Sequence, residues 1–264
     1  MKKKRLIFTL FFKQGYFYLS RNFQLQKVGD MQWLMENYNF GLSSQCIDEL
    51  MIINVGSTDD QKASFIEAVG HLSKNCFVPV TAGGGIRRLD HADELFTSGA
   101  DKVCLNYSFT DDLDLVERIV SKYGRQSIVA SLDVVTKDGE RPVLRTNHST
   151  GDSRFDVSEF LARLDRGGYC GELYLTSVLK DGTGQGLDEC LFSLAELVSL
   201  PVIIAGGAGL AEHLYLGLVH PHVDAVATAN LFNFLGPALE ESRNFLIKNG
   251  IPLANFTGTL QPKG

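Results

Sequence analysis

The sequence predicts an α/β fold in which eight parallel strands, each followed by a helix, close into a barrel. Short apolar runs alternate with longer amphipathic segments, which is typical of strands joined by helical crossovers. Eight such units occupy about 250 residues, the usual length of this architecture. An offset of 122 to 124 residues also superposes the second half of the chain on the first. These observations favour a (β/α)8 TIM barrel built from two similar four-unit halves over a doubly wound sheet, which gives no reason for equivalent halves.

Each predicted strand is a short apolar run that ends at polar residues or glycine. In chain order the runs are Arg5 to Phe12, Glu49 to Asn54, Val78 to Ala82, Lys102 to Leu105, Ser127 to Val134, Glu172 to Thr176, Val202 to Ala205 and Ala225 to Thr228. Helices are predicted between them, among them Asp59 to Lys74, Asp111 to Tyr123, Asp156 to Arg166 and Pro237 to Lys248. Several of these begin with Asp, whose carboxylate caps the free N–H groups of a first helical turn. The long segment from Thr136 to Gly151 predicts a hairpin over the mouth of the barrel.

The repeat is visible in paired strings of residues. "PVTAGGG" in the first half matches "PVIIAGG" in the second, "DKVCLN" matches "DAVATAN", and "DELMIINV" matches "GELYLTSV". The end of the first strand, "TLFFKQG", is repeated in outline by "SLDVVTKDG", with one difference. Phe11 in the first copy corresponds to Asp133 in the second. One half therefore has an apolar ring where the other has a carboxylate.

Composition narrows the class of protein. A net charge of −6 and a pI near 5.5 argue against a nucleic-acid or anionic-membrane partner, because both bind basic surfaces. No window approaches the roughly 18 to 20 apolar residues of a membrane span, and the apolar start lacks a signal-peptide cleavage site. The five cysteines form no CxxC pair, which favours reduced core packing in a cytoplasmic protein over disulfides or zinc. We expect a single domain over residues 1–254, a flexible tail over 255–264, and no metal or cofactor.

Most of the notable polar residues follow predicted strands, at the C-terminal face where such barrels place their active sites. Glycine lets backbone N–H groups approach an anion, and a helix N-terminus adds a favourable dipole. Two glycine segments at equivalent strands therefore predict two phosphate sites, or one site and a vestige, although glycine also makes ordinary tight turns. The predicted phosphate- or substrate-binding residues are Gly83, Gly84, Gly85, Asn106, Thr176, Ser177, Asp181, Gly182, Gly206, Gly207, Thr228 and Asn230.

Three longer stretches carry a family resemblance: "PVTAGGGIRRLDHADELFTSGADKVCLN", "GELYLTSVLKDGTGQG" and "LPVIIAGGAGLAEHL". From about Lys4 to Pro252 the chain resembles the cyclase subunit of imidazole glycerol phosphate synthase, the HisF-like family of the histidine pathway. The resemblance implies a (β/α)8 barrel that binds a HisH-like glutaminase subunit at its N-terminal face. Ammonia from the glutaminase passes through such a barrel and reacts at the C-terminal face with a bisphosphorylated ribulose-aminoimidazole substrate. Two aspartates there act as general acid and base.

The resemblance also implies roles for particular residues. Asp133 matches the second catalytic aspartate, and Phe11 stands in place of the first. A ring of charged residues at the barrel floor, through which ammonia enters, is matched by Arg5, Glu49, Lys102 and Glu172. Four charges at strand starts are costly unless they pair with one another, which favours the ring over separate ion pairs at the rim. Asp101 matches a residue through which the family signals to its glutaminase.

Phenylalanine cannot transfer a proton, whereas a positioned acid or base typically contributes about 10²- to 10⁴-fold to a rate. Asn54, Ala205 and the loop-one string "GYFYLSRNF" also depart from the family's substrate residues, while the ring is complete. This combination resembles a paralogous branch of the family that is found with surface-polysaccharide genes. In that branch a glutaminase and a separate sugar amidotransferase use ammonia to convert an N-acetyl group on a nucleotide sugar into an acetamidino group.

The sequence leaves open whether the chain is itself an enzyme. The leading hypothesis is the paralogue, which conducts ammonia and holds a phosphorylated small molecule. The second is a histidine-pathway cyclase with an unusual first strand, in which another group replaces the missing carboxylate. A non-catalytic scaffold that activates the glutaminase predicts decay of the ring residues. A sugar-phosphate isomerase of the sister barrel family predicts carboxylates on both the first and fifth strands.

Overall fold

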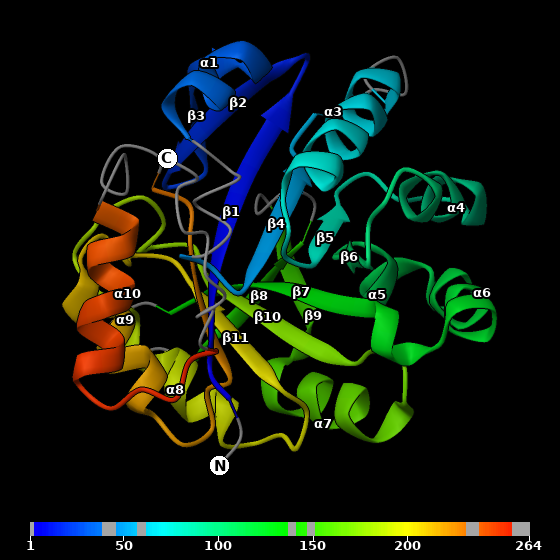
Figure 1. Ribbon diagram of the computed structural model, residues 1–264. Helices are drawn as coiled ribbons and strands as arrows, with labels where there is room; N and C mark the ends of the chain where they lie inside the picture. The colour runs from blue at the N-terminus through cyan, green and yellow to red at the C-terminus, as the bar shows by residue number, and fades with distance from the viewer. Residues whose placement is uncertain are drawn as a thin grey trace.

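The computed structural model describes residues 3–38, 46–56, 62–136, 141–146, 151–230 and 238–254. The expected tail over 255–264 lies outside these residues. Eight parallel strands close into a barrel, which confirms the predicted (β/α)8 architecture (Figure 1). In spatial order the strands are β1 (Arg5–Lys13), β4 (Glu49–Asn54), β5 (Val80–Gly83), β6 (Lys102–Leu105), β7 (Ile128–Val135), β10 (Glu172–Ser177), β11 (Val202–Ala205) and β12 (Ala225–Thr228). Because β12 pairs in parallel with β1, the barrel has no open edge.

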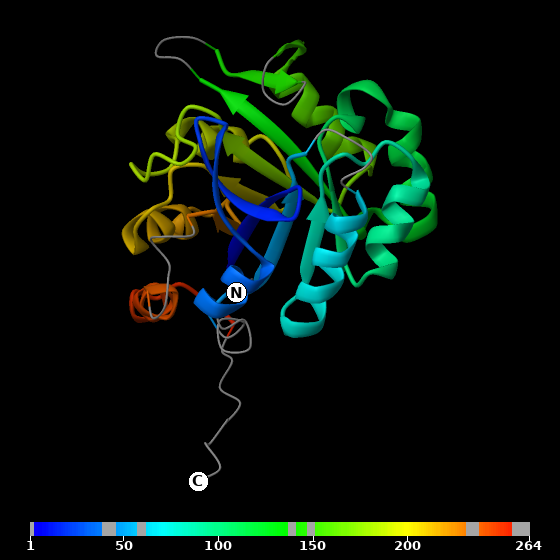
Figure 2. The ribbon, with the colours of Figure 1, turned by 90° about the horizontal axis from the view of Figure 1, so that it is seen from above.

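Helices surround the barrel (Figure 2). In the described residues they are α1 (Met31–Asn37), α3 (Lys62–Asn75), α4 (Leu89–Thr97), α5 (Ser108–Asp111), α6 (Leu113–Tyr123), α7 (Val157–Gly167), α8 (Glu189–Ala195), α9 (Ala211–Val219) and α10 (Ala238–Lys248). The predicted helix starts at Asp59 and Pro237 lie outside the described residues. One apolar core lies between strands and helices, and a smaller one inside the barrel includes Met51 and Ile203. No described helix is long and apolar enough to cross a lipid bilayer.

Most predicted bounds agree with the structure, and two differences have a clear cause. β5 begins at Val80, later than predicted, because Pro79 has no N–H to donate to a neighbouring strand. The helix predicted from Asp111 to Tyr123 begins instead at Leu113, as α6, and the short α5 precedes it. The carboxylate of Asp112 accepts a hydrogen bond from the N–H of Leu115, so that a new helix begins there.

The two halves of the barrel are alike in three dimensions. Equivalent strands begin 122 or 123 residues apart, β1 with β7 and β4 with β10, for example. Gly84 and Gly206 occupy equivalent turns, with φ of 94° and 95°. A Cβ at Gly84 would lie 2.1 Å from the backbone oxygen of Asn54, and one at Gly206 would lie 2.7 Å from that of Ser177. Both turns therefore need glycine for the same two reasons, which supports the duplication inferred from the sequence.

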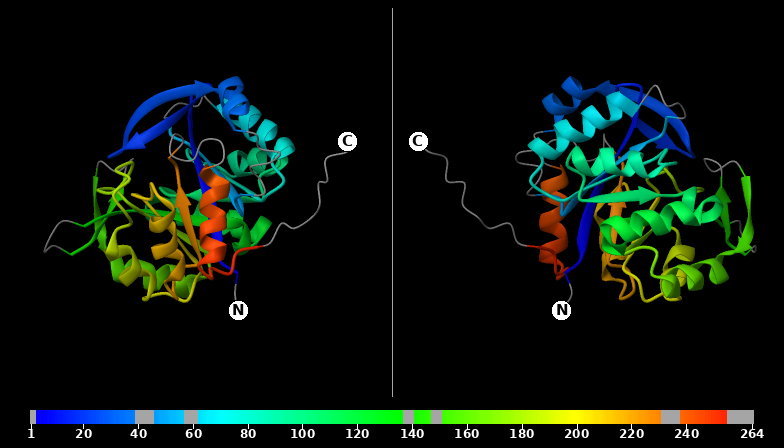
Figure 3. Two further views of the ribbon diagram at one scale, coloured as in Figure 1. Left: turned by 60° about the vertical axis from the view of Figure 1, so that its left-hand side comes forward. Right: turned by 90° about the vertical axis from the view of Figure 1, so that its right-hand side faces the viewer.

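Two hairpins extend from the C-terminal ends of barrel strands. The one predicted after β7 is present: β8 (Val143–Thr146) pairs antiparallel with β7 and with β9 (Gly151–Asp156). The other replaces what was expected to be a loop after β1, where β2 (Tyr16–Arg21) and β3 (Gln24–Asp30) lead into α1. Figure 3 shows β2 and β3 at the end of the barrel opposite the N-terminus. The unpredicted hairpin therefore belongs to the C-terminal face.

A buried ion pair fastens α10 to the N-terminal end of the barrel. Arg243, which is 4% exposed, donates from Nη1 and Nη2 to the carboxylate oxygens of Asp48 at 3.0 and 2.8 Å. The same carboxylate accepts a hydrogen bond from the N–H of Leu6. Because Asp48 directly precedes β4, the pair holds α10, β1 and β4 together beside the first residues of the barrel interior.

Candidate functional site

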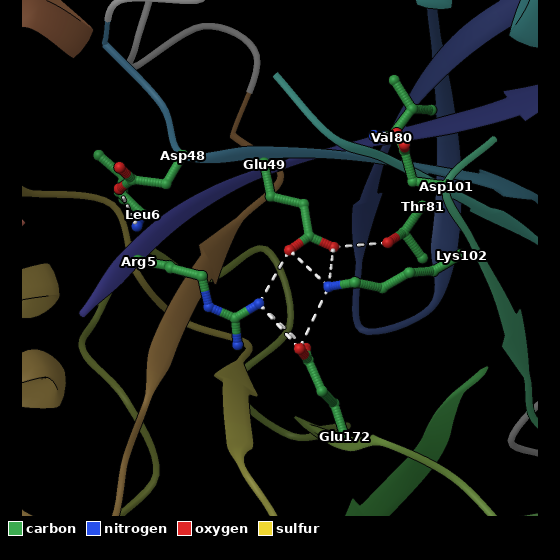
Figure 4. Close-up of polar contacts among 9 residues, drawn as sticks. All are labelled: Arg5, Leu6, Asp48, Glu49, Val80, Thr81, Asp101, Lys102 and Glu172. Carbon is green, nitrogen blue, oxygen red and sulfur yellow. Dashed lines mark hydrogen bonds and ion pairs between the residues drawn. The ribbon is translucent and has the colours of Figure 1, made fainter. Parts of the chain in front are cut away.

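Four charged side chains meet inside the barrel at its N-terminal end. Each is the first residue of its strand, and Figure 4 shows them pointing toward one another: Arg5, Glu49, Lys102 and Glu172. Arg5 Nη1 lies 2.9 Å from Glu49 Oε2 and 3.0 Å from Glu172 Oε2. Lys102 Nζ lies 3.1 Å from one carboxylate oxygen of each glutamate. Positive and negative groups alternate around a closed ring, which we call the charged ring, and all four predicted residues belong to it.

The charged ring is largely withdrawn from water. The side chain of Glu49 is 2% exposed, and those of Glu172, Lys102 and Arg5 are 14%, 18% and 22% exposed. Thr81 of β5 adds a further contact, because its hydroxyl donates to Glu49 Oε1 at 2.5 Å. Burial opposes the charge on Arg5, but attraction to Glu172 and Glu49 outweighs it and raises the pKa of Arg5 above its ordinary value. The ring is a charged floor of the barrel and not a set of surface ion pairs.

Buried side chains occupy the barrel interior between the charged ring and the C-terminal face. Met51 and Ile203 are fully buried there. The hydroxyl of Tyr174, a residue that is 6% exposed, lies 3.4 Å from Thr9 Oγ1. Burial raises the pKa of Tyr174 well above its usual range, so this hydroxyl stays neutral. From Glu172 the remaining inward residues of β10 rise about 13 Å to the mouth. A small molecule that moves from the charged ring to the C-terminal face must therefore pass between these buried side chains and displace them.

A cavity of about 270 Å³ lies at the mouth, the C-terminal face of the barrel. Its walls come from β1, from the β2–β3 hairpin, and from β10, β11 and β12 with the segments that follow them. Phe11 forms part of an apolar wall. The predicted binding residues that line this cavity are Thr176, Asp181, Gly182, Gly206, Gly207, Thr228 and Asn230. The structure therefore brings together the predicted site of the second half of the chain.

The equivalent residues of the first half lie elsewhere. Gly84 and Gly85 border a separate hollow of about 20 Å³ beside α3 and α4. Gly83 packs so closely on β6 that a Cβ would lie 2.2 Å from a backbone oxygen of that strand. Asn106 Nδ2 donates to Asp133 Oδ2 at 3.2 Å, so these two predicted residues contact each other. The cavity of about 270 Å³ thus lies beside the glycines of the second half, and the hollow beside those of the first half is smaller, so a phosphate site at either glycine segment stays a prediction.

Two further predicted residues make internal contacts. Ser177 is fully buried and its hydroxyl donates to Asp188 Oδ2 at 2.6 Å. Alternate residues of a strand face opposite sides, and in β10 it is Thr176 that faces the cavity. Asp101 is exposed, and its Oδ2 accepts from the N–H of Val80 at 2.8 Å. The equivalent aspartate of the second half makes the same contact with β11, so this contact orders the strands, and a role of Asp101 at a partner interface stays a prediction.

Sequence reasoning missed several residues that the structure places at the site. Arg21 and Gln26 of the hairpin line the cavity, because the loop after β1 folds back over the mouth instead of leaving it open. Tyr174 lies in the barrel interior, and only the inward alternation along β10 could have indicated it. Thr81 joins the charged ring without carrying a charge, so a search for ion pairs does not find it.

The described residues offer no group of three or more His, Cys, Asp or Glu side chains placed to hold a metal ion. The five cysteines all lie among the described residues, and none of them forms a disulfide. Burial raises the pKa of Cys104 and of Cys170 to about 12, so both are neutral thiols near pH 7. Both side chains are buried and contribute packing to the barrel.

Comparison with known proteins identifies the family. A family described as "Histidine biosynthesis protein" matches residues 22–235. The chain is 45% identical over 244 residues to "Putative imidazole glycerol phosphate synthase subunit hisF2" of Parasynechococcus marenigrum, a match that covers 92% of this chain and 90% of that protein. It is 33% identical to "Imidazole glycerol phosphate synthase subunit HisF" of Chlorobium luteolum, over 95% of this chain and 98% of that one. This chain belongs to the HisF family.

Compared with what the family resemblance implies, the charged residues at the floor of the barrel are all present, whereas a residue at the mouth differs. The charged ring at the floor has every residue that the family resemblance implies. At the mouth, β1 contributes Phe11, and β7, on the opposite side of the barrel, contributes Asp133. The carboxylate of Asp133 accepts a hydrogen bond from Asn106, whereas the equivalent position of β1 has the apolar ring of Phe11.

Proposed function

We propose that this HisF-family protein receives ammonia from a HisH-like glutaminase subunit bound at its N-terminal face. It supports transfer of that ammonia, together with a separate sugar amidotransferase, in acetamidino modification of a nucleotide sugar for surface polysaccharide. One observation carries the proposal: the charged ring is complete, while β1 has Phe11 near its C-terminal end, where the cyclase reaction uses a carboxylate. With Phe11 in that place, Asp133 lacks the second proton-transfer group that the family resemblance implies.

The properties of the charged ring support the entry of ammonia. Ammonia is small and neutral, and it both donates and accepts hydrogen bonds. A ring of alternating carboxylates and cations offers it both kinds of partner and returns to its closed state when the molecule has passed. The same ring disfavours bulk ions, because the charges inside it already neutralise one another.

The size of the cavity supports an acceptor that is bound elsewhere. Sites for drug-sized ligands usually enclose about 300 to 1,000 Å³. A cavity of about 270 Å³ accommodates a small phosphorylated molecule. A nucleotide sugar is larger, because it contains a base, a ribose, a hexose and two phosphates. The acetamidino group would therefore be formed with the nucleotide sugar bound largely to the amidotransferase.

The cyclase reaction provides the first test. The purified protein is incubated with the bisphosphorylated ribulose-aminoimidazole substrate and ammonium salts, and imidazole product is measured by chromatography. We expect none from the wild type. A small amount from Phe11→Asp would mean that the old substrate still fits. Product from the wild type would overturn the proposal in favour of a histidine-pathway cyclase.

Reconstitution provides the second test. Glutamine and the nucleotide sugar are supplied to the glutaminase, this protein and the amidotransferase, and acetamidino product is measured by mass spectrometry. We expect product only when all three proteins are present. Lys102→Met, which removes one cation of the charged ring, should reduce product, while the control Lys122→Met on the surface of α6 should not. Full product from Lys102→Met, with glutaminase turnover still raised, would instead support a scaffold.

A further inference from the structure

The tip of the β2–β3 hairpin is attached to the segment that follows β10. The hydroxyl of Ser20 donates to Asp181 Oδ2 at 2.5 Å, and the N–H of Phe23 donates to the same oxygen at 3.0 Å. The N–H of Asn22 donates to the backbone oxygen of Asp181, also at 3.0 Å. A Cβ at Gly182 would lie 2.0 Å from the backbone oxygen of Ser20, so the two segments touch along their backbones. Together these contacts form what we call the Asp181 clamp.

The clamp holds the hairpin in a conformation that Phe23 disfavours. Asn22 and Phe23 form the turn with φ of 50° and 60°, a left-handed geometry that bulky side chains rarely adopt. Both of their N–H groups are bound by Asp181. Asp181 is itself only 7% exposed, although the turn it holds lies at the surface end of the barrel. Strained backbone that surrounding contacts hold in place is common at ligand-binding segments.

Arg21 lies between the clamped residues and lines the cavity at the mouth. It is the only Lys or Arg among the described residues that line this cavity. None of the ion pairs formed by the described residues uses Arg21. The backbone of Gly206 and Gly207 lines the same cavity, as does Asn230. The one carboxylate in the lining, that of Asp181, is occupied by the clamp.

We propose that Arg21 selects the ligand of this cavity, a phosphomonoester of a small polyol, and that Asp181 is the positioning residue that holds Arg21 over it. A guanidinium binds two oxygens of a phosphate at once, and the glycine backbone approaches the same group from the barrel side. Without the clamp, the strained turn relaxes and Arg21 leaves the cavity. The inference rests on the proposed function only in placing a phosphorylated small molecule at the mouth.

Binding to the purified full chain tests the proposal without the glutaminase or the amidotransferase. Ribose 5-phosphate is the probe, with ribose and inorganic phosphate for comparison, and affinity is measured by calorimetry at several salt concentrations. We expect ribose 5-phosphate to bind and ribose not to bind. Arg21→Gln should weaken binding at least tenfold and flatten its salt dependence, whereas Arg21→Lys should retain part of it. Arg118→Gln, on the exposed face of α6, should change nothing.

The positioning role predicts that the two residues act together. Asp181→Asn and Ser20→Ala should each weaken binding of ribose 5-phosphate in the wild-type background, Ser20→Ala by less, and neither should matter once Arg21 is Gln. A loss that is equal in both backgrounds would make the clamp merely structural. Wild-type affinity in Arg21→Gln, or no binding of ribose 5-phosphate or phosphate to the wild type, would overturn the proposal. Both outcomes leave the reconstitution test of ammonia transfer unaffected.

Discussion

Replacing Glu49 by Gln tests whether the charged ring acts as one unit. Glutamine has nearly the same shape, but it carries no charge and offers one acceptor oxygen where the carboxylate has two. In the wild type the carboxylate accepts from Arg5, Lys102 and Thr81 at 2.9, 3.1 and 2.5 Å. After the substitution, two cations share the single remaining carboxylate of Glu172.

The expected loss of stability follows from burial. Removing one partner of a buried ion pair typically costs about 3 to 5 kcal/mol, because a charge is left in the interior without compensation. The side chain of Glu49 is 2% exposed, but those of Arg5 and Lys102 are 22% and 18% exposed, so water partly solvates their charges. We therefore expect Glu49→Gln to lower the free energy of unfolding by about 3 kcal/mol, the lower end of that range.

Guanidinium unfolding followed by circular dichroism measures this loss. The control is Arg88→Gln, because the Arg88–Asp90 pair is of similar length, 3.0 Å, but its side chains are 64% and 57% exposed. That substitution should leave the free energy of unfolding unchanged within error. A loss below about 1 kcal/mol for Glu49→Gln, or equal losses for the two variants, would refute the reasoning that the ring is a buried network.

Three further predictions concern other parts of the barrel. Arg243→Met strands the buried carboxylate of Asp48 and should lower the free energy of unfolding by about 3 to 5 kcal/mol in the same assay; a loss under 1 kcal/mol contradicts it. Gly206→Ala should lower the free energy of unfolding by about 1 to 3 kcal/mol, because φ is 95° there and a Cβ would lie 2.7 Å from a backbone oxygen. Gly15→Ala should cost less, because φ is 81° but no atom lies near the added Cβ, and equal losses would show that the contact does not matter. Burial raises the pKa of Asp181, so its contribution to stability is full below about pH 4 and declines as pH rises through that pKa. Asp181→Asn should remove this decline from the pH dependence of the free energy of unfolding. An unchanged pH dependence would contradict the prediction.

The barrel could be predicted because the same local pattern marks its strands in both halves of the chain. Each barrel strand is an apolar run next to glycine or a charged residue, and the repeat requires equivalent strands to have the same partners. The close approaches at Gly84 and Gly206 could be expected from the strings "AGGG" and "AGG" for that reason. The members of the charged ring came from a family resemblance, since nothing local indicates that residues 167 positions apart, Arg5 and Glu172, meet.

The residues that were missed depend on contacts without a local signal. The β2–β3 hairpin turns at Asn22 and Phe23, where a two-residue turn normally contains glycine, so the string "RNFQ" does not indicate it. Its conformation is stabilised by Asp181, a distant residue in the sequence. The phosphate site predicted from the glycines after β5 stays a prediction, and the size of the hollow beside them depends on how α3 and α4 pack there, which composition does not reveal.

Isotope tracing tests the central claim, that ammonia travels inside this protein from glutaminase to acceptor. The reconstituted system is given glutamine labelled with ¹⁵N in its amide, in the presence of a large excess of unlabelled ammonium. The account predicts acetamidino product in which nearly all of the new nitrogen is ¹⁵N, and a marked dilution of the label in Lys102→Met. Product from the wild type with the isotopic composition of the surrounding ammonium would contradict it.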